Sequence, residues 1–154
     1  MKRSLVIPAL VAGSLAIAVI AAPVSAEQQA LVWNADDPDL EWVDCPGFIP
    51  DGCRIAVLQG DPAGNNADIF FRLPPGTFVP YHWHTSAERM ILVSGQLEVD
   101  YDGQEPVTLR PGSYAYGPAG LPHTAHCLDG ADDCVLFIAF EEPVDAVPTE
   151  PAQQ

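Results

Sequence analysis

The chain has 154 residues, of which 48% are hydrophobic and 18% are charged. Six Lys and Arg residues stand against 21 Asp and Glu residues, so the formal net charge is −15. This length predicts one domain, and the apolar content excludes general disorder. The acidic charge argues against binding to nucleic acid, whose affinity depends largely on Lys and Arg, and against binding to anionic membranes.

The first 26 residues are predicted to form a secretory signal peptide. Lys2 and Arg3 make a short basic region, the stretch 5–22 is apolar, and a small-residue cleavage signature ends at Ala26. An uncleaved membrane anchor is the alternative, but the apolar run is marginal for spanning a bilayer and contains a proline and a glycine. We expect cleavage after Ala26, a secreted or periplasmic protein, and no stable membrane insertion.

The elements after the signal peptide are expected to be short strands. Residues 27–52 form an acidic, irregular lead-in, whose Trp33 and Trp42 are expected to pack on the outside of the fold. From residue 53 to 140, short apolar runs alternate with turns rich in Pro and Gly. These runs predict strands over 54–59, 67–73, 78–84, 89–93, 97–101, 107–109, 113–116, 122–127 and 134–140. The acidic, Pro-rich tail 141–154 is expected to be extended.

This succession of strands and turns contains no convincing amphipathic helix and no internal repeat. Asp102-Gly103 between two runs is a strong hairpin signal. Many short strands at close spacing are typical of an all-β sandwich or barrel. The sequence therefore predicts a single all-β barrel over residues 53–140.

All four cysteines follow the predicted cleavage site: Cys45, Cys53, Cys127 and Cys134. In an exported protein an even number of cysteines indicates disulfides. Three pairings are open, and the local one, Cys45 with Cys53 and Cys127 with Cys134, is favoured because each pair closes a short loop. The chain-entropy model gives roughly 2–3 kcal/mol of stabilisation for a loop of that size. A reactive or metal-bound thiol is the alternative.

Three residues with metal-binding side chains lie close together: His82, His84 and Glu88. Alternate side chains of a strand share a face, so both histidines point the same way, and a bend before Glu88 brings its carboxylate alongside. A fourth candidate, His123, lies in another predicted strand. Three imidazoles and one carboxylate suit one divalent transition metal, namely Mn, Fe, Ni, Cu or Zn. Four protein ligands around a six-coordinate ion leave about two positions open for water, dioxygen or substrate.

The same strands predict where the neighbouring side chains point. By alternation, Phe78 and Pro80 share the face of His82 and are expected to form an apolar pocket wall. Tyr81 and Trp83 are expected to point outward. His126 faces away from His123 by the same rule, so we expect it to be exposed rather than to bind metal.

Four glycines and a proline lie in the sequence on either side of the four candidate ligands. They occupy the positions Gly76, Gly95, Gly112, Pro118 and Gly120. With the ligands, these nine positions resemble the two signature motifs of the cupin superfamily, and flanking strands extend the resemblance over about 53–140. The second motif usually ends with Asn where this chain has Cys127, a departure that favours a disulfide to Cys134.

The resemblance implies a single cupin domain, that is, a double-stranded β-helix or jelly-roll barrel with a metal in its mouth. It implies that His82, His84, Glu88 and His123 hold the metal, and that Glu88 can leave the metal and act as a base, as in flavonol-cleaving cupins. A homodimer is also expected from the family.

Three function classes fit this site. The first is an exported metal-dependent dioxygenase or oxidase that acts on a small organic molecule. The second is a redox-neutral decarboxylase, isomerase or lyase, which is weakened because no second catalytic acid is evident beside the ligands. The third is a non-catalytic protein that binds or senses a metal or small ligand, since one barrel hosts many chemistries.

Overall fold

The structure is a computed structural model that describes residues 30–130 and 132–151. The predicted signal peptide, residues 1–26, lies outside these residues. All eleven strands belong to one compact unit that begins at Val32. The described residues contain no helix, and so none that is long and apolar enough to cross a membrane.

The described residues form eleven β-strands. Their bounds are β1 Trp42–Asp44, β2 Arg54–Gln59, β3 Ala67–Leu73, β4 Phe78–Trp83, β5 Glu88–Ser94, β6 Leu97–Tyr101, β7 Val107–Leu109, β8 Tyr114–Gly117, β9 His123–Cys127, β10 Cys134–Phe140 and β11 Val147–Pro148. Strands β2 to β10 match the nine predicted segments to within one residue at each end. The expected all-β fold is therefore confirmed.

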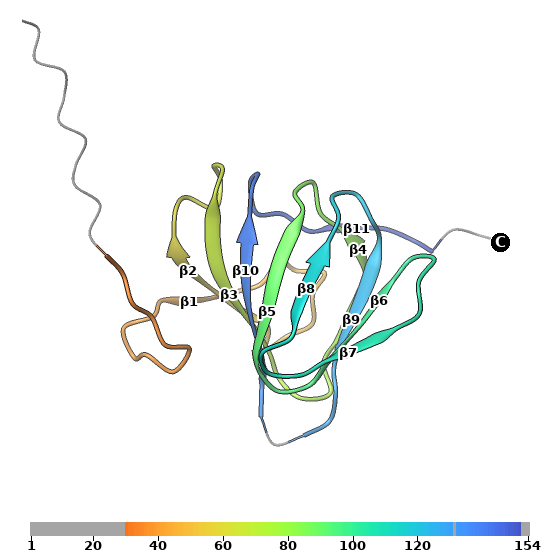
Figure 1. Ribbon diagram of the computed structural model, residues 1–154, viewed down its shortest axis with the longest axis horizontal. Helices are drawn as coiled ribbons and strands as arrows, with labels where there is room; N and C mark the ends of the chain where they lie inside the picture. Colours follow the sequence, from red (N-terminus) through yellow and green to blue (C-terminus); the bar gives the residue numbers. More distant parts are fainter. Residues whose placement is uncertain (1–29, 131, 152–154) are drawn as a thin grey trace, which may run out of the picture. The chain divides into compact units, whose positions relative to one another are not determined.

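The strands make two antiparallel sheets, in the orders β1-β2-β3-β10-β5-β8 and β11-β4-β9-β6-β7 (Figure 1). The main core lies between them, because it unites buried side chains of both sheets, such as Leu92 and Ile138 from the first and Val79 and Leu97 from the second. This arrangement is a jelly-roll barrel whose apolar interior is shared by the two sheets.

The lead-in, expected to be irregular, contributes the short strand β1, which pairs with β2. Trp42 lies on the outer face of the first sheet, where it stacks on Phe70 with ring centroids 6.4 Å apart. The Arg72 guanidinium lies 4.1 Å from the centre of the Trp42 ring. A second apolar cluster on this face includes Leu40 and Val135. Trp42 therefore packs on the outside of the fold as expected, and strands β3 and β10 are covered on both faces.

The acidic tail, expected to be extended, contributes the short strand β11. Val147 pairs with Trp83 and Pro148 with His82, and the backbone NH of Thr149 donates to the Tyr81 carbonyl at 3.1 Å. This pairing covers the free edge of β4, which would otherwise expose unpaired backbone groups. It also brings the residues before β11 against the metal-site candidates.

Strand β4 contains a bulge that changes which side chains point inward. Val79 pairs with Ala125, but His82 pairs with His123. Between these two pairs β4 advances by three residues and β9 by only two, so β4 has one extra residue. The extra residue reverses the alternation. Val79, not Phe78, therefore faces the interior, with 1% of its surface exposed against 50% for Phe78. The expectation that Phe78 and Pro80 form the pocket wall was wrong, because strict alternation does not hold across a bulge.

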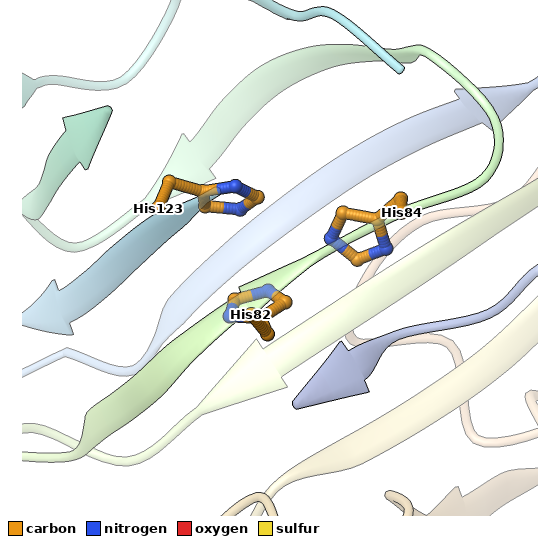
Figure 2. Close-up of side chains that lie close together, drawn as sticks. All are labelled: His82, His84 and His123. Atoms are coloured by element: carbon orange, nitrogen blue, oxygen red, sulfur yellow. The ribbon is translucent and has the colours of Figure 1, made fainter. Parts of the chain in front are cut away.

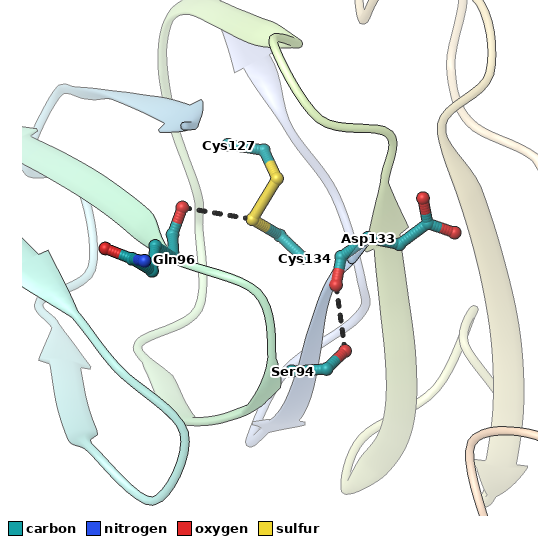
Figure 3. Close-up of a disulfide and its surroundings, with 5 residues drawn as sticks. All are labelled: Ser94, Gln96, Cys127, Asp133 and Cys134. Carbon is teal, nitrogen blue, oxygen red and sulfur yellow. Dashed lines mark hydrogen bonds between the residues drawn. A yellow bond between two sulfur atoms is a disulfide. The ribbon is translucent and has the colours of Figure 1, made fainter. Parts of the chain in front are cut away.

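All four cysteines form the two local disulfides, Cys45–Cys53 and Cys127–Cys134. The alternative of a reactive or metal-bound thiol was wrong. The second disulfide joins β9 to β10 and so links the two sheets (Figure 3). The Cys134 sulfur lies 3.2 Å from the Gln96 carbonyl oxygen. Two disulfides indicate an oxidising compartment.

Gly95, in the turn between β5 and β6, has a φ of +77° and lies directly against the chain at Cys134. A Cβ there would come within 2.8 Å of the Cys134 Cα and of the Asp133 carbonyl oxygen. We expect Gly95→Ala to lower the free energy of unfolding by at least about 2 kcal/mol, since the left-handed conformation alone costs about 1 kcal/mol and backbone overlap adds to it. Urea denaturation measures the loss.

Gly103 provides the matched control for that substitution. Its φ is +75°, but a Cβ there would have no neighbour within 4 Å. Gly103→Ala should therefore lose only the conformational part, about 1 kcal/mol. Equal losses in the two variants would contradict the role of close packing at Gly95.

Candidate metal centre

The four predicted ligands come from three strand ends and converge inside the barrel. His82 lies near the end of β4, His84 just beyond it, Glu88 at the start of β5 and His123 at the start of β9. All four are buried, with 4–8% of their surfaces exposed. The three imidazole rings point toward one another, with one ligand atom from each within 4.8 Å of the others (Figure 2).

Backbone carbonyls orient all three imidazoles. Each Nδ1 lies at hydrogen-bond distance from a carbonyl oxygen, which fixes Nδ1 as the protonated nitrogen and leaves Nε2 with its lone pair. The pairs are His82 with Pro80 at 2.7 Å, His123 with Leu121 at 3.2 Å, and His84 with Asp145. The backbone thus presents three Nε2 donors to one region.

Glu88 supplies the carboxylate beside these nitrogens. Its Oε2 lies 3.3 Å from His84 Nε2 and 3.7 Å from His123 Nε2. Neither Glu88 Oε2 nor His84 Nε2 has a hydrogen-bond partner, although both are buried. Buried polar groups without partners are rare in proteins, and a buried carboxylate requires a counter-charge. A divalent transition metal fits this donor set, and the three histidines could hold it.

Burial also sets the protonation of the site. Burial lowers the pKa of His82 to about 4 and the pKa of His123 to about 3, and repulsion from neighbouring histidines lowers both pKa values further. Burial raises the pKa of Glu88 above its ordinary value, against the opposing effect of His84. His82 and His123 are therefore neutral at pH 7, the form that binds metal.

The metal-free protein is expected to lose stability as the pH falls from 6.5 toward 4. The pKa values of His82 and His123 are lowered in the folded state, so in this range the unfolded chain takes up protons that the folded chain does not. Their contribution is complete above pH 6.5 and is lost as the pH falls through the lowered values. Thermal unfolding in the presence of a chelator, at several pH values, measures it.

A His82→Gln/His123→Gln double variant separates this effect from the titration of the 21 acidic residues, Glu88 among them, which both proteins share. The stability difference, wild type minus variant, should decrease toward low pH. A difference that is constant or that increases on acidification would contradict the explanation.

A cavity of about 260 Å³ opens onto the candidate ligands from inside the barrel. Its polar lining consists of six side chains: His82, His84, Glu88, Tyr101, His123 and Asp145. The rest of the lining is apolar and includes Val79 of β4. An engineered apolar cavity of about 150 Å³ binds benzene, so this one has room for a small organic molecule.

Sequence reasoning missed Tyr101, which lies on β6 opposite His123. The two rings are 4.8 Å apart, and the buried Tyr101 Oη has no hydrogen-bond partner. A Cβ on Gly117 would lie 2.7 Å from Tyr101 Oη and 3.1 Å from Glu88 Oε2, so only glycine leaves room for both groups. Burial and the Glu88 charge raise the pKa of Tyr101, which keeps its hydroxyl a proton donor. The inward alternation of residues 97, 99 and 101 could have revealed it.

Asp145 in the tail was also missed, and no local signal could have revealed it. Its carboxylate accepts hydrogen bonds from the Thr85 NH at 2.9 Å and the Thr85 hydroxyl at 2.8 Å. Its backbone oxygen accepts from His84 Nδ1. The tail therefore holds the turn that carries His84, a contact between residues about 60 positions apart.

The other predicted orientations are mostly as expected. Tyr81 and Trp83 are absent from the cavity lining. His126 lies outside the histidine cluster, but it is half-buried rather than exposed. Its ring meets the edge of the Phe78 ring, with centroids 6.1 Å apart. The bulge explains this contact, because it turns Phe78 toward the outer face.

The fold and the site together define a jelly-roll barrel whose interior holds a cluster of side chains suited to binding a transition metal. The family model described as cupin domain matches residues 69–140, which include all four candidate ligands. Over these residues the chain is a cupin domain.

Two curated proteins are similar in sequence. Dimethylsulfoniopropionate lyase DddQ of Ruegeria pomeroyi is 28% identical over 79 residues, which make up 50% of this chain and 39% of that protein. Oxalate decarboxylase OxdC of Bacillus subtilis is 30% identical over 89 residues, 54% of this chain and 23% of that protein. The chain thus spans well under two thirds of the length of both relatives.

Solved structures agree on the fold. The crystal structure of DddQ from Ruegeria pomeroyi matches with a TM-score of 0.62 at 20% identity, over 75% of this chain and 64% of that one. An RmlC-like cupin from Shewanella frigidimarina matches with a TM-score of 0.60 at 17% identity, over 77% of this chain and 95% of that one. Matches at this identity show the shared jelly-roll fold.

Proposed function

We propose that His82, His84, Glu88 and His123 hold one divalent transition metal and that the protein is a metal-dependent enzyme acting on a small organic molecule. The observation that carries the proposal is a buried cluster of four metal-binding side chains that faces an apolar cavity and in which His84 Nε2 and Glu88 Oε2 have no hydrogen-bond partner. When bound, such an ion supplies Lewis-acid or redox activation of the substrate. The ion's identity, among Mn, Fe, Ni, Cu and Zn, stays open.

A redox-neutral bond cleavage, of the lyase or decarboxylase type, has the best support. Glu88 lines the cavity and, once released from the ion, would accept a proton from a substrate there; Tyr101 lines the same cavity and would donate one to a developing anion or leaving group. Tyr101 is the second acid whose absence weakened this class in the sequence reasoning. The names of the two curated relatives, a lyase and a decarboxylase, support the same class.

A dioxygenase or oxidase is the second candidate. It is supported by the donor set, since three imidazoles and one carboxylate leave coordination positions open for dioxygen. The two classes differ in one measurable respect, because only the second consumes oxygen.

The test measures turnover of a panel of small carboxylates and phenols by metal-loaded protein, with and without dioxygen. For redox-neutral cleavage we expect anaerobic turnover that falls roughly 100-fold or more in Tyr101→Phe, the usual size of a general-acid contribution, with metal content unchanged. Oxygen consumed in proportion to product would favour the dioxygenase instead. Ligands that raise the melting temperature but are never converted would favour a binding or sensing protein.

We also propose that residues 1–26 direct export and are removed afterwards. Both disulfides lie in the remaining chain and support an oxidising destination. N-terminal sequencing of the protein from the periplasm or medium should begin at Glu27, and a start at residue 1 would contradict the proposal.

A further inference from the structure

We propose that the cavity selects substrates with one anionic head group and an uncharged, apolar body, and that it rejects molecules carrying a second carboxylate. This inference rests on the proposed function, because the bound metal receives the head group. It adds a substrate class that the donor set alone does not specify.

The first argument is the composition of the cavity wall. Beyond the candidate ligands, Tyr101 and Asp145, every lining side chain is apolar, and the described lining contains no Lys or Arg. Asp145 is itself acidic, and its carboxylate is already occupied by Thr85. A second anionic group in the substrate would therefore meet apolar walls and two acidic residues instead of a cation.

The second argument is where the basic residues are. The only lysine is Lys2, and the arginines of the described residues are held elsewhere. The three that make ionic or aromatic contacts do so as Arg54 with Asp44, Arg89 with Glu141, and Arg72 with the Trp42 ring. Arg110 lines a separate hollow with Gly95 and Asp129. Each lies outside the cavity lining, so none can pair with a buried substrate anion.

The third argument is the charge of the loaded site. Counted over the ion and its four ligands alone, two positive charges of the ion, one negative charge of Glu88 and three neutral imidazoles leave one net positive charge. One anionic head group neutralises it. A second carboxylate buried without a partner is costly, whereas each buried methylene is favourable, by roughly a threefold to fourfold gain in affinity.

The test titrates Co²⁺-loaded protein with 3-methylbenzoate and with isophthalate, followed by the visible absorption of the cobalt. The two rigid probes differ only by a methyl group in place of a second carboxylate, and neither can chelate one ion through two carboxylates. We expect 3-methylbenzoate to bind about tenfold or more tightly. Along the series from acetate to pentanoate, affinity should rise roughly threefold to fourfold per methylene.

A rim substitution tests the cause. Val57 lines the cavity and is 40% exposed, so Val57→Arg can place a cation at the rim without disturbing the core. It should reduce the preference for 3-methylbenzoate at least fivefold. Val93, which is 42% exposed and lies outside the cavity lining, is the matched control, and Val93→Arg should leave the preference unchanged.

The outcomes separate this inference from the proposed function. Failure of the protein to bind Co²⁺ stoichiometrically would overturn the metal site and, with it, the inference. Stoichiometric Co²⁺ binding with equal affinity for the two probes would overturn the inference alone. An unchanged preference in Val57→Arg would also overturn it, because the missing cation would then not be the cause of selectivity.

Discussion

Replacement of His123 by alanine is expected to abolish stoichiometric metal binding while the barrel stays folded. His123 supplies one of three Nε2 donors that the backbone has already oriented, and its ring lies 4.3 Å from that of His82 and 5.3 Å from that of His84. Loss of a single outer hydrogen bond to a ligand commonly weakens metal binding about 10–100-fold, so loss of the ligand itself should weaken it by more. His82→Ala should have the same effect.

His126→Ala is the matched control, because His126 lies on the same strand, β9, but outside the histidine cluster. Elemental analysis after dialysis measures the metal content, and circular dichroism measures folding. We expect about one ion per chain in the wild type and in His126→Ala, and almost none in His123→Ala. Full metal content in both His82→Ala and His123→Ala would refute the assignment of the ligands.

The Cys127–Cys134 disulfide is expected to make the larger contribution to stability of the two. Both of its residues are almost fully buried, with 0% and 1% exposed, and it links β9 of one sheet to β10 of the other. Nearby, the Ser94 hydroxyl donates to the Asp133 carbonyl at 2.8 Å and so anchors the same end of β10 (Figure 3). Cys127→Ala/Cys134→Ala should lower the free energy of unfolding by about 3–5 kcal/mol.

The other disulfide is a control of nearly equal loop length, with sequence separations of 8 and 7 residues. The chain-entropy contributions are therefore almost equal, and any difference reports burial and the link between the sheets. Cys45→Ala/Cys53→Ala should lose about 2–3 kcal/mol in urea denaturation. An equal or larger loss for that pair would contradict the explanation.

The strands from β2 to β10 could be predicted from sequence because their signals are local. Apolar runs such as 67–73 and 134–140 end at Pro, Gly or acidic residues, and the residues that end a strand lie next to it in the chain. The strands β1 and β11 could not be predicted in this way. β11 has two residues and pairs with the edge of β4, a distant strand. β1 pairs with β2, the next strand along the chain, but its three residues are too few to form an apolar run.

The candidate ligands were also predictable, because their residue types and spacing persist whatever the surrounding geometry. The cavity wall around these ligands could not be predicted from the sequence. The bulge between Val79 and His82 is a property of how β4 pairs with β9, and it moved Phe78 outward. Tyr101 acquires a role only through its position opposite His123.

The amino-acid sequence by itself determined the strands from β2 to β10 and the four residues with metal-binding side chains, and it favoured the local disulfide pairs, since each depends on neighbours in the chain. The tertiary structure alone decided which side chains share the cavity with those residues, that Asp145 holds His84, and that no described basic side chain lines the wall. The physical reason is that pairing between strands, and not order along the chain, sets the distances at which side chains act on one another.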